Sequence, residues 1–133
     1  MHPLYRKANA LSREVIGAAV EVHRIMGAGL IESIYTRCLV RELELRNVLT
    51  VRERLVMIEY KGMTFEEPLR LDVLVNECLL LELKAVQDVL PIHRAQLLSY
   101  MKLLDIPVGL LINFHEIKVT AGIHRMILQG AGN

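Results

Sequence analysis

The sequence predicts a mixed α/β domain of the α+β type, in which helices flank a central mixed sheet. Three observations predict this fold class. Apolar residues recur at helical spacing near the start of the chain and again after residue 91. Short runs of strand-forming residues, divided by turn residues, fill the chain between residues 50 and 84. The length of 133 residues suits one domain, which we expect to span residues 1–133.

Two helices are expected before the sheet. Residues 12–26 carry apolar side chains at helical spacing, and the glycine-rich segment 27–29 ends that helix. A second helix is expected over about 30–46, with Ile31 and Leu45 among the residues on its inner face.

The middle of the chain is expected to form four short strands joined by tight turns. Their predicted ranges are Leu55–Tyr60, Met63–Glu66, Leu69–Val75 and Cys78–Leu83. Lys61–Gly62 and Asn76–Glu77 are the turn dipeptides expected between them.

A helix and two further strands are expected in the last third of the chain. The helix begins at Pro91, because proline suits the first turn of a helix, and reaches about Leu104. The nearly continuous apolar run 108–113 predicts a buried strand, and 122–128 a final one. The expected order of elements is therefore ααββββαββ.

Composition and charge exclude several classes of protein. The hydrophobic fraction of 53% excludes a disordered chain. Sixteen basic and 15 acidic residues give a net charge of +1, which disfavours nucleic-acid binding by bulk electrostatics but not a local charged site. The two cysteines lack metal-type spacing and are typical of reduced thiols. We expect a cytoplasmic protein without signal peptide or membrane partner, because charged residues precede any long apolar run.

Two carboxylates fall on neighbouring strands of the predicted sheet. A turn centred on Glu77 places Asp72 opposite Glu82, with Cβ atoms roughly 4.5–5.5 Å apart. Carboxylates at that distance repel and lose hydration, and a Mg²⁺ or Mn²⁺ ion would compensate both effects. Lys84 lies on the same face of its strand as Glu82. The alternative is a solvated face or a simple cluster of ion pairs.

The third predicted helix carries a polar stripe. His93, Gln96 and Tyr100 share one face and can bind a phosphate or hold a catalytic group in place. The alternative is an amphipathic helix with an ordinary solvent side.

Glu32 opens the second predicted helix. A carboxylate in the first turn is favourable to the helix dipole, which is a sufficient structural reason for it. Its functional interpretation is a third carboxylate at a metal site, with Tyr35 beside it to shield or orient it.

Gly29-x-x-Glu32-x-x-Tyr35 resembles the signature of the GxxExxY proteins. Three further stretches agree with that family in order, namely Ile16–His23, Leu71–Asp72 with Glu82–Val86, and His93–Phe114. The resemblance covers about residues 10–128. This family is similar to the PD-(D/E)XK nuclease superfamily, in the branch with a Gln-x-x-x-Tyr motif, which implies a restriction-endonuclease-like sheet.

The resemblance also implies roles for individual residues. The implied metal ligands are Glu32, Asp72, Glu82 and the backbone carbonyl of Leu83. Lys84 would assist the attacking water, and Gln96 and Tyr100 would support the substrate or the site. One departure is that Leu71, rather than proline, precedes Asp72, and the proline performs no chemistry.

These observations predict a Mg²⁺- or Mn²⁺-dependent nuclease that hydrolyses phosphodiester bonds of DNA or RNA. Two alternatives stay open. One is a non-catalytic oligomerising or nucleic-acid-binding accessory module on the same scaffold, and the other is a metal-dependent hydrolase of small nucleotides. The sequence leaves the oligomeric state open, with a homodimer among the options.

Overall fold

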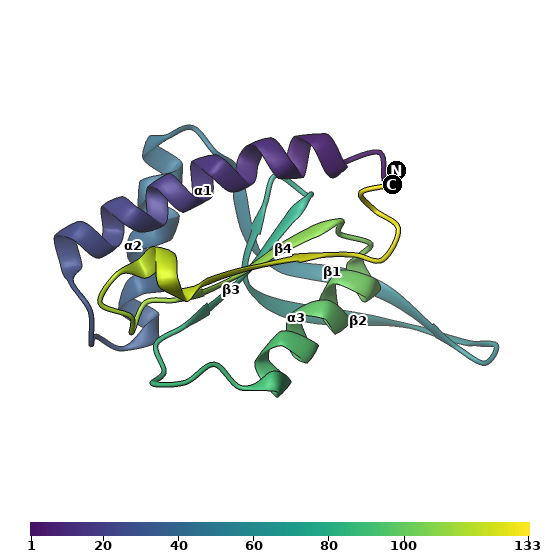
Figure 1. Cartoon of the computed structure of the whole chain (residues 1–133). Coiled ribbons are helices and arrows are strands. Elements are labelled where there is room, and N and C mark those ends of the chain that lie inside the picture. The colour runs from purple at the N-terminus through teal and green to yellow at the C-terminus, as the bar shows by residue number, and fades with distance from the viewer.

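Two helices precede the sheet in a computed structural model that describes residues 1–133 (Figure 1). Helix α1 spans Tyr5–Met26 and helix α2 spans Glu32–Leu45. Helix α1 begins before the predicted residue 12. Helix α2 begins after Ile31 and ends at Leu45, so these two side chains lie at its ends. They are 67% and 60% exposed, and the expectation that they face inward was wrong.

Three strands, not four, fill the middle of the chain. The remaining elements are β1 (Thr50–Tyr60), β2 (Met63–Val75), β3 (Leu79–Lys84), α3 (Pro91–Leu104), β4 (Val108–Asn113), a short 3₁₀ turn (Val119–Gly122) and β5 (Ile123–Ile127). The two strands predicted within β2 are one strand that continues through Pro68. The sheet accepts a proline there because β2 has no neighbour on its second edge at that point. The order of elements is therefore ααβββαββ.

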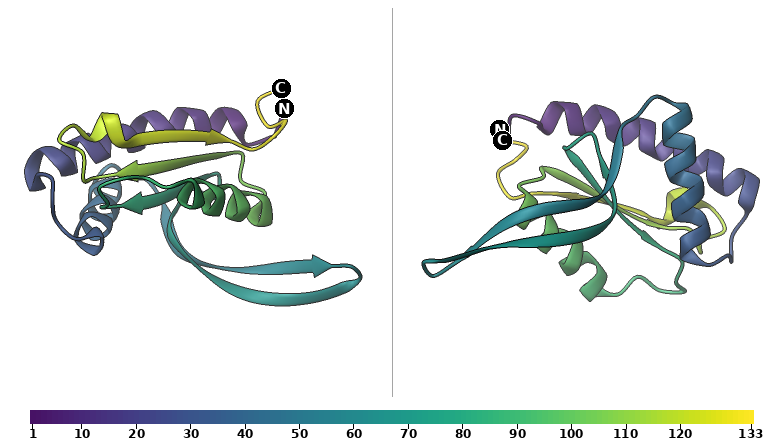
Figure 2. Two further views of the ribbon diagram at one scale, coloured as in Figure 1. Left: turned by 60° about the horizontal axis from the view of Figure 1, so that its bottom comes forward. Right: turned by 180° about the vertical axis from the view of Figure 1, so that it is seen from behind.

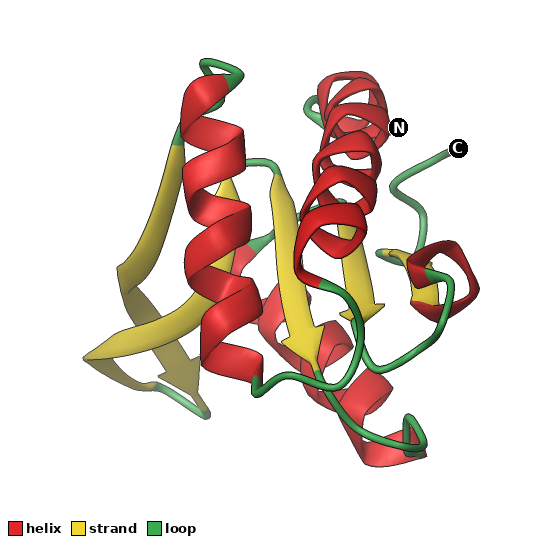
Figure 3. Ribbon diagram, turned by 90° about the vertical axis from the view of Figure 1, so that its left-hand side faces the viewer, coloured by secondary structure: helices red, strands yellow, loops and turns green.

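The five strands form one mixed sheet in the order β1-β2-β3-β4-β5. Strands β3 and β4 are parallel, and the other neighbouring pairs are antiparallel. Figure 3 shows α1 and α2 in front of the strands and α3 behind them. This confirms the predicted central mixed sheet flanked by helices, which is consistent with a restriction-endonuclease-like fold.

Apolar side chains fill both interfaces of the sheet. The larger core lies under α1 and α2 and includes Leu81 and Leu83 of β3. The smaller core lies under α3 and includes Leu80. Because side chains alternate along a strand, Glu82 and Lys84 lie on the α3 face of β3.

A bulge interrupts the pairing of β1 with β2. Three residues of β2, Leu71 to Val73, stand opposite the single residue Arg52. The bulge resets the alternation of side chains, so Leu71 lies in the α3-side core while Val73 lies in the other. Strict alternation predicts these two side chains on one face, and that prediction was wrong.

Beyond the bulge, β1 and β2 leave the sheet as a two-stranded arm, residues 54–70, which projects from the rest of the molecule (Figure 2). The arm closes at Lys61–Gly62, whose φ angles of 46° and 85° are both positive. Two positive φ angles in a two-residue hairpin loop define a type I′ turn, which matches the twist of the strands. The predicted turn is confirmed.

Gly109 of β4 lies where α3 packs directly on the strand backbone. A Cβ at this position would lie 2.6 Å from the sulfur of Met101 and 3.1 Å from a methyl of Leu97. We expect Gly109→Ala to lower the free energy of unfolding by about 1–3 kcal/mol, because α3 must shift. Chemical denaturation measures this change.

Gly17→Ala in α1 is the matched control. Its Cβ would meet only the flexible guanidinium of Arg46, at 3.2 Å, and alanine favours a helix by about 0.5–1 kcal/mol over glycine. Equal effects of the two substitutions would show that α3 does not pack closely on β4.

Candidate active site

Asp72 of β2 lies directly beyond the last residues that pair β2 with β3. Val73 pairs with Leu81, as the predicted turn requires, and the regular ladder ends there. The Asp72 carboxylate then turns to the backbone of β3, where its Oδ2 accepts the N–H of Leu83 at 2.7 Å. Asp72 therefore takes the place of a ladder hydrogen bond and is held beside Glu82.

Glu82 and Lys84 form an ion pair at the end of β3. Their Oε1 and Nζ atoms are 3.3 Å apart, and their side chains are only 13% and 16% exposed. The pKa of Glu82 lies above its ordinary value, because burial disfavours the charged form and the neighbouring Asp72 charge adds to this effect. Lys84 opposes the shift without cancelling it, so the pKa of Glu82 stays raised.

Helix α2 contributes a third carboxylate at its first residue, Glu32. Burial raises the pKa of Glu32, the charge of Asp72 raises it further, and the charge of Lys84 lowers it. The Glu32 carboxylate therefore lies close enough to Asp72 of β2 and Lys84 of β3 to interact with their charges. No group of three or more His, Cys, Asp or Glu side chains has the spacing of a complete metal site.

Helix α3 faces the carboxylates with two of the three polar residues predicted for it. A depression of about 90 Å³ is lined by Arg70, Leu71, Asp72, Leu80, Glu82, Gln96 and Tyr100. Gln96 and Tyr100 thus meet Asp72 and Glu82 at one surface. Arg70 was missed at the level of sequence, although its position two residues before Asp72 on the same strand was a usable signal.

His93 does not line this depression. Its Nδ1 accepts the N–H of Leu90 at 3.0 Å and so caps the start of α3. Pro91 at the first turn favours the same start. The contact that the structure gives His93 therefore fixes the helix that carries Gln96 and Tyr100.

Tyr35 is fully buried and acts on the loop before Glu32. Its hydroxyl donates to the carbonyl of Gly27 at 2.6 Å and accepts the N–H of Leu30 at 3.0 Å. Its ring stacks on Phe114, with centroids 4.6 Å apart and planes 7° from parallel. Tyr35 therefore holds the chain that leads into α2, and the position of Glu32 depends on it.

Asn113 is a second residue that sequence reasoning missed. Its buried side-chain amide donates to the carbonyl of Val86 at 2.8 Å and accepts the N–H of Val86 at 3.1 Å. It also accepts the N–H of His115 at 3.2 Å. These bonds tie down the segment that follows Lys84. A polar residue that ends an otherwise apolar strand was the available signal.

The donors at this surface fit a hard divalent cation. They are carboxylate oxygens, and neither the depression nor the carboxylate cluster includes a histidine or cysteine. Burial raises the pKa of Glu32 and of Glu82, so a bound cation would favour their charged forms. Mg²⁺ commonly binds through one or two carboxylates and keeps several waters, which suits an open set of ligands.

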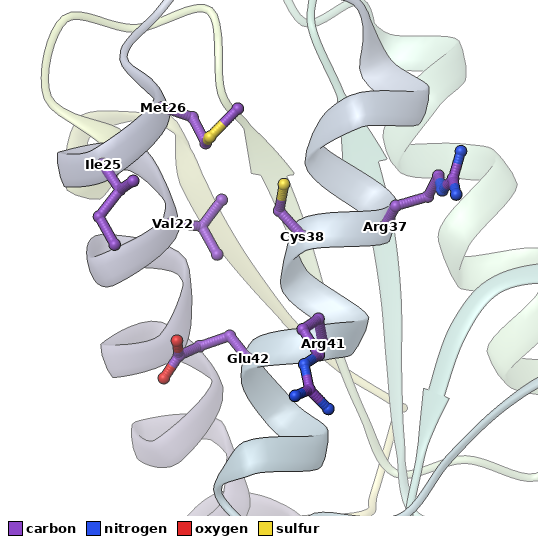
Figure 4. A pocket seen from close by; sticks show the side chains of 7 residues that line it. All are labelled: Val22, Ile25, Met26, Arg37, Cys38, Arg41 and Glu42. Carbon is purple, nitrogen blue, oxygen red and sulfur yellow. The ribbon is translucent and has the colours of Figure 1, made fainter.

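A separate groove of about 270 Å³ lies between α1 and α2 (Figure 4). Its lining is mainly apolar, with Val22, Met26 and Cys38 between the two helices. Its one carboxylate, Glu42, already binds Arg46 at 2.8 Å. This groove therefore lacks the free carboxylates of the candidate active site.

Residues 9–126 match the family model of the PD-(D/E)XK nuclease superfamily. The match covers most of the chain, which therefore belongs to this superfamily, as the motifs predict. No curated protein and no solved structure matches the chain. None of its helices combines the length and the apolar character needed to cross a membrane.

Removing the Tyr35 hydroxyl should loosen the loop before α2. We expect Tyr35→Phe to lower the free energy of unfolding by about 1–3 kcal/mol, because two partly buried backbone groups lose their partner. Thermal and chemical denaturation measure the loss. Tyr60→Phe is the control, since Tyr60 is 60% exposed on the arm. A loss at both positions would show that the Tyr35 hydroxyl has no special role.

The raised pKa of Glu82 makes the stability of the metal-free protein depend on pH. Protonated Glu82 favours the fold, so its contribution is fully present below the ordinary pKa of 4.5 and is lost as pH rises through the higher folded pKa. Glu82→Gln, which stays neutral, should therefore raise Tm in EDTA at pH 8 and lose this advantage near pH 4. Glu59→Gln, on the exposed arm, should show no such trend. An equal gain for Glu82→Gln at both pH values would contradict the raised pKa.

Proposed function

We propose that the chain is a metal-dependent nuclease that hydrolyses phosphodiester bonds of DNA. The observation that carries the proposal is the clustering of Glu32, Asp72, Glu82 and Lys84, supplied by α2, β2 and β3, in a member of a nuclease superfamily. Isolated surface carboxylates are solvated by water. The carboxylates of this cluster are instead partly buried and repel one another.

Asp72 and Glu82 would hold Mg²⁺ or Mn²⁺, with Glu32 and the carbonyl of Leu83 as further oxygen donors. When bound, such an ion lowers the pKa of a water ligand and polarises a phosphate oxygen. The hydrogen bond from the N–H of Leu83 occupies Oδ2 of Asp72 and leaves Oδ1 for the ion. That division fixes the carboxylate before any ligand arrives.

Lys84 would position the attacking water and offset negative charge that develops on the phosphate. Its ammonium is close to Glu82 and largely buried, and low exposure strengthens the interaction of a fixed charge with a reacting group. Gln96 and Tyr100 would donate hydrogen bonds to the phosphate from the opposite wall of the depression.

Arginines near the site support a polyanionic substrate over a small nucleotide. Arg70 lines the depression that holds Asp72 and Glu82. A second depression, of about 260 Å³, lies against α2 and is lined by Arg37, Arg41 and Arg52 together with Val40 and Glu44. Arg52 also donates to the carbonyl of Asp72 at 3.0 Å, which places this basic surface beside the site. Arg41 is paired with Glu44 at 2.6 Å, so Arg37, Arg52 and Arg70 are the arginines that would contact a chain of phosphates.

The proposal predicts metal-dependent cleavage that requires Lys84 and Asp72. We expect Lys84→Ala and Asp72→Ala to lower the rate of DNA cleavage in Mg²⁺ or Mn²⁺ by about 100-fold or more, since each removes a fixed charge at the reacting phosphate. Lys118→Ala, at an exposed position outside the site, is the control. The assay uses single-stranded and duplex DNA, with RNA and small nucleotides as further substrates.

A direct binding measurement separates the metal from the reaction. Mn²⁺ should raise Tm of the wild type and not of Asp72→Ala, because the variant lacks a ligand. Binding of DNA without cleavage by any preparation would favour the non-catalytic accessory module. Cleavage of small nucleotides alone would favour the other alternative.

A further inference from the structure

The arm exposes apolar side chains to solvent on both of its faces. Leu55, Met57 and Tyr60 are each 60% exposed, Met63 is 55% exposed and Phe65 is 39% exposed. Leu55 and Met57 lie on one face and Tyr60 on the other, because side chains alternate along β1. An isolated two-stranded hairpin is only marginally stable in water. Exposed apolar surface of this extent on a projecting hairpin is typical of a surface that contacts another molecule.

The charge of the arm indicates the class of molecule that covers it. Over residues 54–70 the arm holds three basic residues, Arg54, Lys61 and Arg70, and three glutamates, so it carries no net charge. The arm therefore lacks the excess of positive charge that would hold a nucleic acid or an anionic membrane. The apolar side chains between these charges suit another protein surface.

The free edge of β1 is the part of the arm that can accept another strand. Strand β1 lies at the end of the sheet order and pairs only with β2. It has no proline over Thr50–Tyr60, so every N–H on its outer edge can donate. The free edge of β2 in the arm is interrupted by Pro68. A strand added to the arm therefore pairs with β1.

We propose that this added strand is β1 of a second copy of the chain, antiparallel to the first and related to it by a two-fold axis. In an antiparallel pair, directly opposed residues lie on the same face of the sheet. The two-fold axis therefore passes between one residue and the same residue of the second copy. With Val56 at the axis, Glu53 would face Glu59 of the second copy, and like charges would repel. With Met57 at the axis, Glu53 comes opposite Lys61, which lies in the turn of the second copy directly after its β1, and symmetry repeats this attractive pair.

The same symmetry brings the apolar tip of each arm to the base of the other. A two-fold axis through the middle of the arm exchanges tip and base, so Tyr60 and Met63 of one copy lie beside the base of the second. That base has a depression of about 290 Å³ that is lined by apolar residues, among them Leu55, Met57, Leu74 and Ile106, and by the charged side chains of Arg54 and Glu77. Tip and base are thus complementary in chemistry.

Charge exchange tests this dimer on the full chain. Sedimentation velocity from about 1 to about 300 µM covers the Kd range of weak and moderate dimers. We expect the wild type to dimerise, and Glu53→Lys and Lys61→Glu each to weaken the dimer roughly tenfold, since two attractive pairs become repulsive. An equimolar mixture of the two variants should recover the wild-type affinity, because each supplies the charge that the other lacks.

Two further variants complete the experiment. Met57→Glu should give a monomer, because it opposes two carboxylates at the axis. Ile117→Glu, at a position 90% exposed and outside the arm, should leave the dimer unchanged. Circular dichroism checks that each variant is folded. A wild type that stays monomeric, a mixture no tighter than its components, or a dimer that Ile117→Glu also disrupts would overturn the proposal.

Discussion

Burial of β3 on both of its faces is the constraint on which the candidate site depends. Leucines of this strand enter the core under α1 and α2 on one side and the core under α3 on the other. Polar groups in such a strand lose hydration, and each needs a partner inside the protein. Glu82 and Lys84 are therefore held close together at the end of β3, and their charges act at short range through a medium poor in water.

Contacts from several elements around β3 fix the positions of Glu32 and Lys84. Tyr35 ties the loop before α2 to the ring of Phe114, and the N–H of Phe114 donates to the carbonyl of Lys84 at 2.8 Å. Asn113, the next residue back along the chain, fixes Val86 just beyond Lys84. The position of Glu32 relative to Lys84 is thus set by buried contacts rather than by exposed side chains, which is the rigidity that a reacting group requires.

Much of the site could be predicted because its spacing is local. The turn at Asn76–Glu77 sets the register of β2 and β3, and helical spacing puts Gln96 and Tyr100 on one face. What the sequence pattern could not reveal depends on contacts between distant segments. The bulge opposite Arg52 arises from a mismatch between two strands, and it alone decides that Leu71 faces α3. Likewise, Pro68 predicts a break between two strands unless it is known that β2 has no neighbouring strand on its second edge at that point.

The parallel pairing of β3 with β4 has a consequence for how the protein folds. The strands β1 and β2 meet through a two-residue turn, whereas β3 pairs with residues 29 positions further along the chain, such as Leu79 with Val108. Contacts of long sequence separation carry a larger loop-closure entropy and form later than local ones. The hairpin can therefore form early, while Glu82 and Lys84 gain their final surroundings only after α3 has crossed over and β4 has docked. Any catalytic capacity of the cluster is thus a late product of folding, absent from partly folded chains.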